Sequence, residues 1–227
     1  MARVGSLDTL DRRRLDLRVP GFRLVLPGLP KPLHLAAGLL SAQGLSLADK
    51  WAAARFMRAL ESQGFSLPSD RPASALLAEH SQPDNLIAKL WEPLCVAALN
   101  TPLDQASAQV FCNVLRDSLA GPREASDLAF NRADLGAAFP DAAARFIAAR
   151  AGTIHVGAKV TGVDKIANGY HLEGVDCEAG RVIVAVHPAR LASLLAGLPE
   201  LSDTIAGVAA YAWQPILSLW LRFAQAV

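Results

Sequence analysis

Apolar and polar positions follow two different periods along this chain, and the period changes near residue 150. Between residues 31 and 150, apolar residues mostly recur every three or four positions, as they do on one face of an α-helix. Beyond residue 152 they alternate or run together, as they do in β-strands. The pattern predicts a helical block to about residue 121, then a block of strands and helices, and therefore an α+β fold class.

Several helix boundaries are marked by residue type. A short apolar helix is expected at 31–41. Ser46 is expected to cap a helix at 47–61, with Asp49 at its third position and Gly64 just beyond its end. Ser69 or Asp70 is expected to cap the next helix, at 72–80. The remaining expected helices are 141–150, 188–196, 199–209 and a pair between 84 and 119 with a turn at 100–102.

The strand signals lie at the two ends of the chain. Residues 13–19 and 22–26 are expected to form strands around a Pro20–Gly21 turn. Asn168–Gly169 is typical of the centre of a type I′ hairpin turn. The other expected strands are 153–156, 159–167, 169–174, 181–186 and a closing strand at 214–223.

Composition narrows the function classes. A net charge of +1 gives no electrostatic case for nucleic-acid binding. The 52% hydrophobic and 19% charged content suits a chain that covers apolar surface with a partner or binds an apolar ligand. The cysteines Cys95, Cys112 and Cys177 have no CxxC spacing and are expected to be reduced, cytoplasmic thiols. The five histidines lack zinc-site spacing, so no metal is expected.

Residues 204–221 carry no charge and approach the length of a membrane-spanning helix. Pro215 interrupts this stretch, and strand-like alternation follows it. We therefore expect a buried helix end and a buried strand there, not a membrane span.

Residues 90–119 read LWEPLCVAALNTPLDQASAQVFCNVLRDSL. This stretch resembles the flavin-dependent hydroxysqualene dehydroxylases of hopanoid biosynthesis, also called squalene-associated desaturases, within the amine oxidase and phytoene desaturase group. The resemblance implies an FAD-dependent oxidoreductase that converts hydroxysqualene to squalene. It also implies a lead-in at 1–30, a helical substrate domain at 31–150, a β-rich segment of a split FAD domain at 151–190, and returning helices and a strand at 191–227.

The resemblance also suggests where a long apolar isoprenoid would bind. Seven apolar positions between Leu86 and Ala98 are more than a two-helix contact needs, so some must face other core elements or a ligand. In the family, the helical domain roofs the substrate tunnel. We therefore expect the helix pair at 84–119 to form one wall of an elongated apolar cavity, with substrate-binding residues Trp91, Leu94, Cys95 and Phe111. Plain core packing is the alternative.

Two later segments resemble the family's second contribution to the FAD domain: TIHVGAKVTGVDKI at 153–166 and RVIVAVHP at 181–188. By motif position, the backbone of Val160 would contact the adenine, and Ala185 and Pro188 would lie near the flavin. The alternation by itself also fits an ordinary β-meander. No residue has the pattern of a catalytic acid or base, and catalytic residues are left unassigned.

The family's GxGxxG turn, its ribose-binding Glu and its closing glycine-rich motif are absent from the sequence. We therefore expect a central part of an enzyme, inactive and without bound FAD by itself. Its expected partner is the missing flavin-domain half, or a second copy held through an exposed apolar patch, in the cytoplasm or peripherally at the inner membrane. The alternatives are a carotenoid or phytoene desaturase, an amine oxidase relative, or a non-catalytic lipid-binding module.

Overall fold

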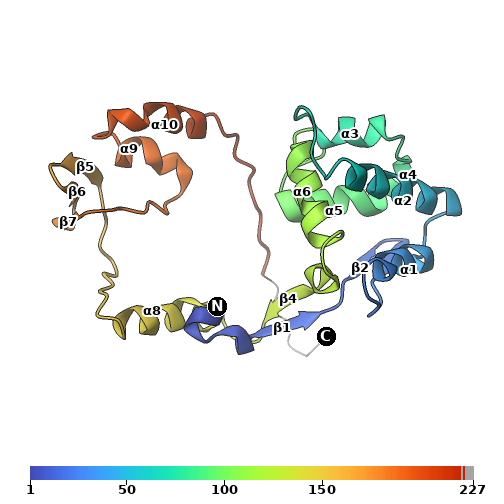
Figure 1. The fold of residues 1–227 in the computed structure, drawn as a ribbon, viewed down its shortest axis with the longest axis horizontal. Helices are drawn as coiled ribbons and strands as arrows, with labels where there is room; N and C mark the ends of the chain where they lie inside the picture. The colour runs from blue at the N-terminus through green and yellow to red at the C-terminus, as the bar shows by residue number, and fades with distance from the viewer. Residues whose placement is uncertain (221, 223–227) are drawn as a thin grey trace. The chain divides into compact units, whose positions relative to one another are not determined.

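The computed structural model describes residues 1–220 and residue 222, and the chain divides into two compact units (Figure 1). Unit 1 contains Met1–Ala142 and the described residues from Ile216 onward, and unit 2 contains Ala143–Pro215. Helices and short strands occur in both units, which confirms the α+β class. The division into functional domains stays a prediction.

Unit 1 is mainly helical, with two small antiparallel ladders. Its strands are β1 (Leu10–Arg13), β2 (Asp16–Val19), β3 (Phe22–Val25) and β4 (Leu128–Asn131). Its α-helices are α1 (Leu33–Ser41), α2 (Leu47–Ser62), α3 (Ala73–Glu79), α4 (Asp84–Leu86), α5 (Glu92–Leu99), α6 (Ala108–Ser118) and α7 (Leu135–Ala138), while α8 (Pro140–Ala148) crosses into unit 2. The 3-10 turns are η1 (Ala2–Val4), η2 (Leu7–Thr9) and η4 (Arg123–Ser126), and the π-helical segment η3 covers Ile87–Trp91.

The N-terminal hairpin is confirmed, whereas a second strand pair was not predicted. Strands β2 and β3 pair antiparallel, with Val19 opposite Phe22 around the turn that contains Gly21. Strand β1 pairs with β4, which places Leu10 opposite Asn131. Charged residues interrupt the apolar alternation of β1, and its partner lies far along the chain, so periodicity could not reveal this pair.

The ends of α2 are as the sequence predicts. Asp49 N–H donates to Ser46 Oγ at 3.1 Å, and Ser46 N–H donates to Asp49 Oδ2 at 2.9 Å. Gly64 follows the helix with φ 61°, a left-handed conformation that glycine adopts without steric cost. Local chemistry therefore fixes both ends of this helix.

The predicted cap of α3 is wrong. Pro72 occupies the N-cap position, and neither Ser69 nor Asp70 caps the helix. The Asp70 carboxylate instead accepts hydrogen bonds from the backbone N–H of Arg71 at 2.9 Å and of Gln109, near the start of α6, at 3.0 Å. Asp70 therefore binds the start of α6 instead of capping α3.

The expected helix across 86–98 contains a π-helical segment. The backbone N–H of Glu92 donates to the carbonyl of Ile87, five residues earlier. Pro93 has no N–H to offer the carbonyl of Lys89, which interrupts the α-helical hydrogen-bond series at this point. The core of unit 1 collects around Trp91, whose ring centroid lies 5.2 Å from that of Phe56 and 6.5 Å from that of Phe111.

Unit 2 is a three-stranded meander with short helices. Its elements are β5 (Gly162–Ile166), β6 (Gly169–Glu173), β7 (Cys177–Ala179), η5 (Pro188–Arg190), α9 (Leu191–Leu194), η6 (Pro199–Leu201) and α10 (Ser202–Ala209). Its small core is built on Val163, Leu194, Leu195 and Leu198. The hairpin is confirmed but its turn type is wrong: Ile166 pairs with Gly169, so the turn residues are Ala167 and Asn168, and neither has positive φ.

Two predicted strands of unit 2 are not formed. Residues 153–156 and 181–186 have no regular structure, and Val156 and Ile183 are 93% and 94% exposed. A strand is stable only when a neighbour satisfies its backbone groups, and among the described residues no strand pairs with these segments. Figure 1 shows the chain leaving α10 without forming the expected closing strand.

The predicted closing strand at 214–223 is wrong for residues 214–220 and 222, which have no regular structure. Positions 221 and 223 lie outside the described residues. Over the part of the chain that the structure describes, none of the helices has the length and apolar character needed to span a membrane.

Candidate apolar binding pocket

An apolar pocket of about 750 Å³ lies against α1 and α2 in unit 1. This volume is within the range of roughly 300–1,000 Å³ that small-molecule sites occupy. The apolar side chains that form most of its wall include Leu24, Leu35, Leu39, Met57, Leu90 and Leu119. We call this space the helix pocket.

The local sequence explains why space remains between these two helices. Leu35 and Leu39 are four residues apart on α1 and therefore lie on the same helix face. Ala53 and Ala54 on α2 are too small to fill the volume that larger residues would occupy. The result is a concave surface with an apolar wall.

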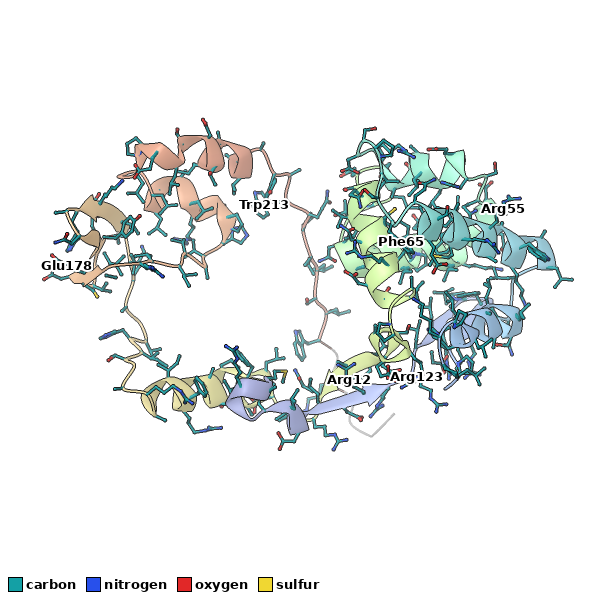
Figure 2. The ribbon with its side chains drawn as sticks, viewed as in Figure 1. Arg12, Arg55, Phe65, Arg123, Glu178 and Trp213 are labelled. Atoms are coloured by element: carbon teal, nitrogen blue, oxygen red, sulfur yellow. The ribbon has the colours of Figure 1, made fainter. Side chains whose placement is uncertain are left out.

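The charged residues of the pocket wall all lie on α2. They are Arg55, Arg58 and Glu61, and each side chain is exposed. Figure 2 labels Arg55, which extends from α2. Long charged side chains of this kind place their aliphatic stems along apolar surface and keep their charged ends in water.

Trp91 is held rigidly where it meets the helix pocket. Its side chain is 1% exposed, and Nε1 donates a hydrogen bond to Gln82 Oε1 at 2.9 Å. Gln82 Nε2 in turn donates to the carbonyl of Ala52 at 3.2 Å, which ties the indole to α2. Trp91 also ends the π-helical segment, and such segments often occur at functional sites.

Of the four residues predicted to line an apolar cavity, the structure brings only Trp91 to the wall of the helix pocket. Cys95 and Phe111 are completely buried in the unit 1 core, and Leu94 packs against that core. Helical spacing identifies an apolar face but not which part of that face meets a void. The substrate-binding role of these four residues stays a prediction.

The buried cysteines are ordinary core residues chemically. Burial raises the pKa of the Cys95 thiol to about 11, and burial also raises that of Cys112 to about 11. Thiols with such pKa values stay protonated at neutral pH and are poor nucleophiles. The three cysteines, including the exposed Cys177, are free.

A residue that the sequence did not single out lies beside the helix pocket. His34, in the first turn of α1, lines a small adjoining cavity of about 60 Å³. The two spaces share Pro32, Leu35, Met57, Glu61 and Leu119 in their walls. His34 is 1% exposed, and neither Nδ1 nor Nε2 has a hydrogen-bond partner.

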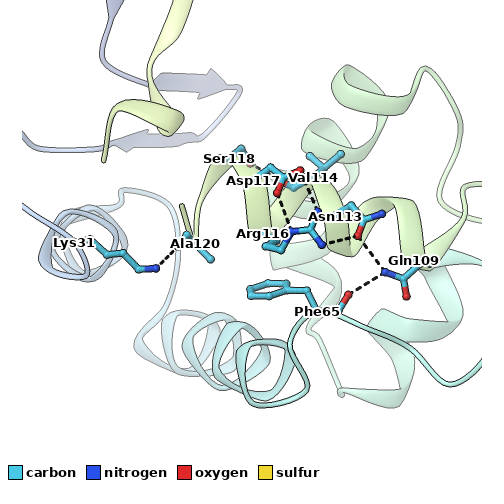
Figure 3. A network of polar contacts seen from close by, with 9 residues as sticks. All are labelled: Lys31, Phe65, Gln109, Asn113, Val114, Arg116, Asp117, Ser118 and Ala120. Carbon is cyan, nitrogen blue, oxygen red and sulfur yellow. Dashed lines mark hydrogen bonds and ion pairs between the residues drawn. The ribbon is translucent and has the colours of Figure 1, made fainter. Parts of the chain in front are cut away.

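The small cavity is lined by residues from distant parts of unit 1. Lys31 and Ala120 both line it, and the Lys31 ammonium donates to the Ala120 carbonyl (Figure 3). Phe65, also in its wall, accepts a hydrogen bond at its carbonyl from Gln109 Nε2 at 2.9 Å. These contacts connect the start of α1, the end of α2 and α6 around His34.

The residues predicted to contact FAD lie in unit 2. Val160 is partly buried and packs against the small core, Ala185 is exposed within 181–186, and Pro188 begins η5. Segments 153–156 and 181–186 present mainly apolar side chains to solvent, and the sequence has no glycine-rich turn to hold a pyrophosphate. The described residues by themselves do not fit a flavin, and the roles of Val160, Ala185 and Pro188 stay predictions.

Among the described residues, no group of three or more His, Cys, Asp or Glu side chains could hold a metal ion. A family model described as flavin containing amine oxidoreductase matches residues 3–227. A search of the curated proteins found no match. The family match spans both the helix pocket and the meander of unit 2.

Proposed function

This chain belongs to the flavin containing amine oxidoreductase family, and from that premise we propose that its helix pocket binds the substrate of an FAD-dependent oxidoreductase. The proposed substrate is a long isoprenoid alcohol, hydroxysqualene, and the proposed product is squalene, a precursor in hopanoid biosynthesis. In this reaction the carbon–oxygen bond breaks, a hydride forms the new carbon–hydrogen bond, and the hydroxyl takes up a proton and leaves as water. The two electrons come from a reductant, and in this family FAD is the redox group.

The observation that carries the proposal is the chemistry of the helix pocket. Its wall is apolar apart from three α2 side chains whose charged ends are exposed. Transfer of a hydrocarbon chain from water to such a surface is favourable by about 25 cal/mol for each Å² of apolar area buried. A long isoprenoid would gain this energy along its length, whereas a small polar amine would gain little.

A partner that completes the flavin site belongs to the same proposal. Most apolar side chains of 153–156 and 181–186 are exposed, including Val156 and Ile183. Exposed apolar surface of this kind is typical of interaction sites. The proposed partner is a flavin-domain half or a second copy of this chain.

The pocket can be tested by binding measurements on the purified chain. Trp51 and Trp91 both line the helix pocket, so intrinsic fluorescence should report a ligand there. We expect detergent-solubilised hydroxysqualene to give a saturable change. Ala54→Phe, which puts a ring into the pocket, should weaken binding by about tenfold or more. Ala97→Phe is the matched control, because Ala97 is an exposed α5 residue outside the pocket wall.

Other ligands separate the rival functions. Tighter binding of phytoene would favour a carotenoid or phytoene desaturase, and tighter binding of benzylamine would favour an amine oxidase. Equal binding of hydroxysqualene and fatty acids would favour a non-catalytic lipid-binding module. If hydroxysqualene does not bind, or if Ala54→Phe binds it as tightly as the unmodified chain, the proposal is wrong.

A further inference from the structure

The solvent-facing sides of α1 and of the first turns of α2 carry large apolar side chains. Residues 32–48, which include the whole of α1, contain no Asp, Glu, Lys or Arg. Leu40 is 69% exposed near the end of α1, and Leu47 and Trp51 on α2 are 74% and 76% exposed. Leu33, two turns before Leu40 on the same face of α1, is also exposed. We call these four side chains the leucine–tryptophan face.

The leucine–tryptophan face lies beside the helix pocket. Lys50 Nζ donates a hydrogen bond to the Leu40 carbonyl at 2.6 Å, so the end of α1 lies next to the first turn of α2. Leu47 and Trp51 are four residues apart and share one face of α2. Trp51 also belongs to the pocket wall, together with Leu39 of α1. Because so exposed a side chain forms part of its wall, the pocket opens on this side of unit 1.

The charged side chains of α2 that reach solvent are mainly basic. Lys50 lies between Leu47 and Trp51, and Arg55 (Figure 2) and Arg58 follow in the next two turns. Over the described part of the chain, neither arginine forms an ion pair.

The other charges near this face do not offset the basic ones. Lys89 adds a positive charge, because its Nζ donates to the Gly44 carbonyl at 3.0 Å in the loop that joins α1 to α2. Of the two acidic residues of α2, Asp49 is buried. Glu61 lies beyond Trp51 by about 15 Å along the helix axis.

We propose that the leucine–tryptophan face docks on the surface of an anionic lipid bilayer. Leucine and tryptophan side chains bury well at the boundary between headgroups and acyl chains, where tryptophan is enriched in membrane proteins. Basic side chains next to them are attracted to anionic headgroups. A fluid bilayer accommodates protruding side chains, whereas a folded protein partner would need both matching hollows and acidic groups at fixed positions.

Docking in this orientation turns the opening of the helix pocket toward the lipid. An apolar ligand can then pass from the bilayer into the pocket without crossing water, which avoids the cost of exposing its hydrocarbon surface. The docking itself does not depend on which ligand the pocket holds, so it goes beyond the proposed function.

The test measures binding of the purified chain to extruded vesicles by co-sedimentation. One vesicle preparation is phosphatidylcholine, and the other is phosphatidylcholine and phosphatidylglycerol at roughly three to one. We expect the anionic vesicles to bind at least about tenfold more tightly, since each basic residue at such a surface contributes about fivefold. Raised salt should reduce this difference by screening the charges.

Matched variants assign the binding to the leucine–tryptophan face. Leu47→Asn should weaken binding to anionic vesicles by about tenfold, because the apolar side chain no longer enters the lipid. Leu135→Asn is the control: Leu135 is 76% exposed and, like Leu47, is the first residue of a helix whose N-cap side chain accepts a backbone hydrogen bond. Its binding and both melting temperatures should equal those of the unmodified chain.

The basic residues need a control for net charge. The double variant Arg55→Gln, Arg58→Gln should bind anionic vesicles about twentyfold less tightly. The double variant Arg145→Gln, Arg181→Gln removes the same charge from exposed positions of unit 2 and should bind like the unmodified chain. Equal weakening in the two double variants would mean that only net charge matters, and would overturn the assignment.

Tryptophan quenching by brominated phosphatidylcholine in the anionic vesicles locates the contact. We expect quenching in the unmodified chain and its loss in Trp51→Phe. Trp213 and Trp220 are also exposed, so quenching that survives in Trp51→Phe would place the contact elsewhere and overturn the proposal.

The remaining outcomes separate this inference from the proposed function. Absence of vesicle binding, or equal binding to both kinds of vesicle, overturns the docking. Dimers that Leu47→Asn dissociates, without vesicle binding, would make the face a contact between copies and also overturn it. Because Leu47 is outside the pocket wall, Leu47→Asn should bind detergent-solubilised hydroxysqualene like the unmodified chain. Vesicle binding without hydroxysqualene binding would support the docking and contradict only the proposed function.

Discussion

At the scale of single residues, the buried polar groups of unit 1 differ in how their hydrogen bonds are satisfied. Gln82 links the Trp91 indole to the backbone of α2, and the Asp49 carboxylate accepts from Ser46 N–H and from Asn85 Nδ2, each at 2.9 Å. These contacts hold α2 and the segment that begins at α4 together beside the helix pocket. His34 differs from them, because both of its ring nitrogens are unpaired.

The buried Asp49 should make stability depend on pH. The hydrogen bond from the Ser46 backbone N–H is the main factor that lowers the pKa of this carboxyl below its ordinary value of 3.8. Its stabilising contribution is therefore complete above pH 3.8 and is lost as the pH falls through the lower pKa of the folded state. Urea unfolding of the unmodified chain and Asp49→Asn, from neutral to strongly acidic pH, measures the difference.

We expect Asp49→Asn to be less stable by about 1 kcal/mol at neutral pH, with the gap closing in acid. Asp8→Asn is a suitable control, because Asp8 lies outside this network and is exposed. A gap that is the same at every pH would contradict the assignment of this stabilisation to the Asp49 charge.

At the scale of elements, hydrogen bonds between residues close in sequence determine the ends of α2. In unit 2, the β6 and β7 backbones approach each other closely at Gly169, and this contact shapes the meander. Gly169 begins β6 with φ 149°, and a Cβ at this position would collide with the carbonyl oxygen of Ala179 at the end of β7. A glycine at this position therefore lets the third strand pair close to the hairpin. The meander in turn supports Val163 in the unit 2 core.

Gly169→Ala should destabilise unit 2 by more than about 1 kcal/mol, because alanine meets both an unfavourable φ and a backbone clash. Gly180→Ala is the matched control: its φ is not in the left-handed region, and no heavy atom lies within 4 Å of the added Cβ. Hydrogen exchange of the amides of β5 and β6 measures the local effect. Equal protection in the two variants would show that the Gly169 backbone can relax.

At the scale of the whole molecule, the chain combines a pocket-bearing helical unit with a second unit that leaves apolar segments exposed. The chain belongs to a flavin-dependent family, yet its sequence lacks the GxGxxG turn that holds the cofactor pyrophosphate. These two facts make opposite predictions about FAD binding, so FAD binding to the purified chain should be measured.

The purified chain should be colourless and should bind added FAD far below stoichiometric occupancy. The described residues form no pyrophosphate cradle, and contacts to the adenine alone would not offset the entropy lost on binding a large cofactor. Visible absorbance after purification and quenching of FAD fluorescence during titration measure this. Near-stoichiometric flavin in the purified chain would show that Val160, Ala185 and Pro188 belong to a more complete site than these segments suggest.

The sequence by itself determined the features that depend on neighbours along the chain. Ser46, Asp49 and Gly64 mark the ends of α2 because their hydrogen bonds and backbone angles involve residues a few positions away. The same holds for the β2–β3 hairpin, and helical spacing correctly placed Trp91, Cys95 and Phe111 on buried faces. The α+β class follows from the same local periodicities.

Only the tertiary structure decided which buried faces meet a void and which polar groups meet partners. The pairing of β1 with β4, the bond from Gln109 N–H to Asp70, and the absence of strands at 153–156 and 181–186 each depend on neighbours distant in sequence. The helix pocket is likewise bounded by segments from Leu24 to Leu119, and His34 lacks partners because of what surrounds it in space. Periodicity records which side of an element is apolar, but cavities and hydrogen-bond partners are properties of the packed chain.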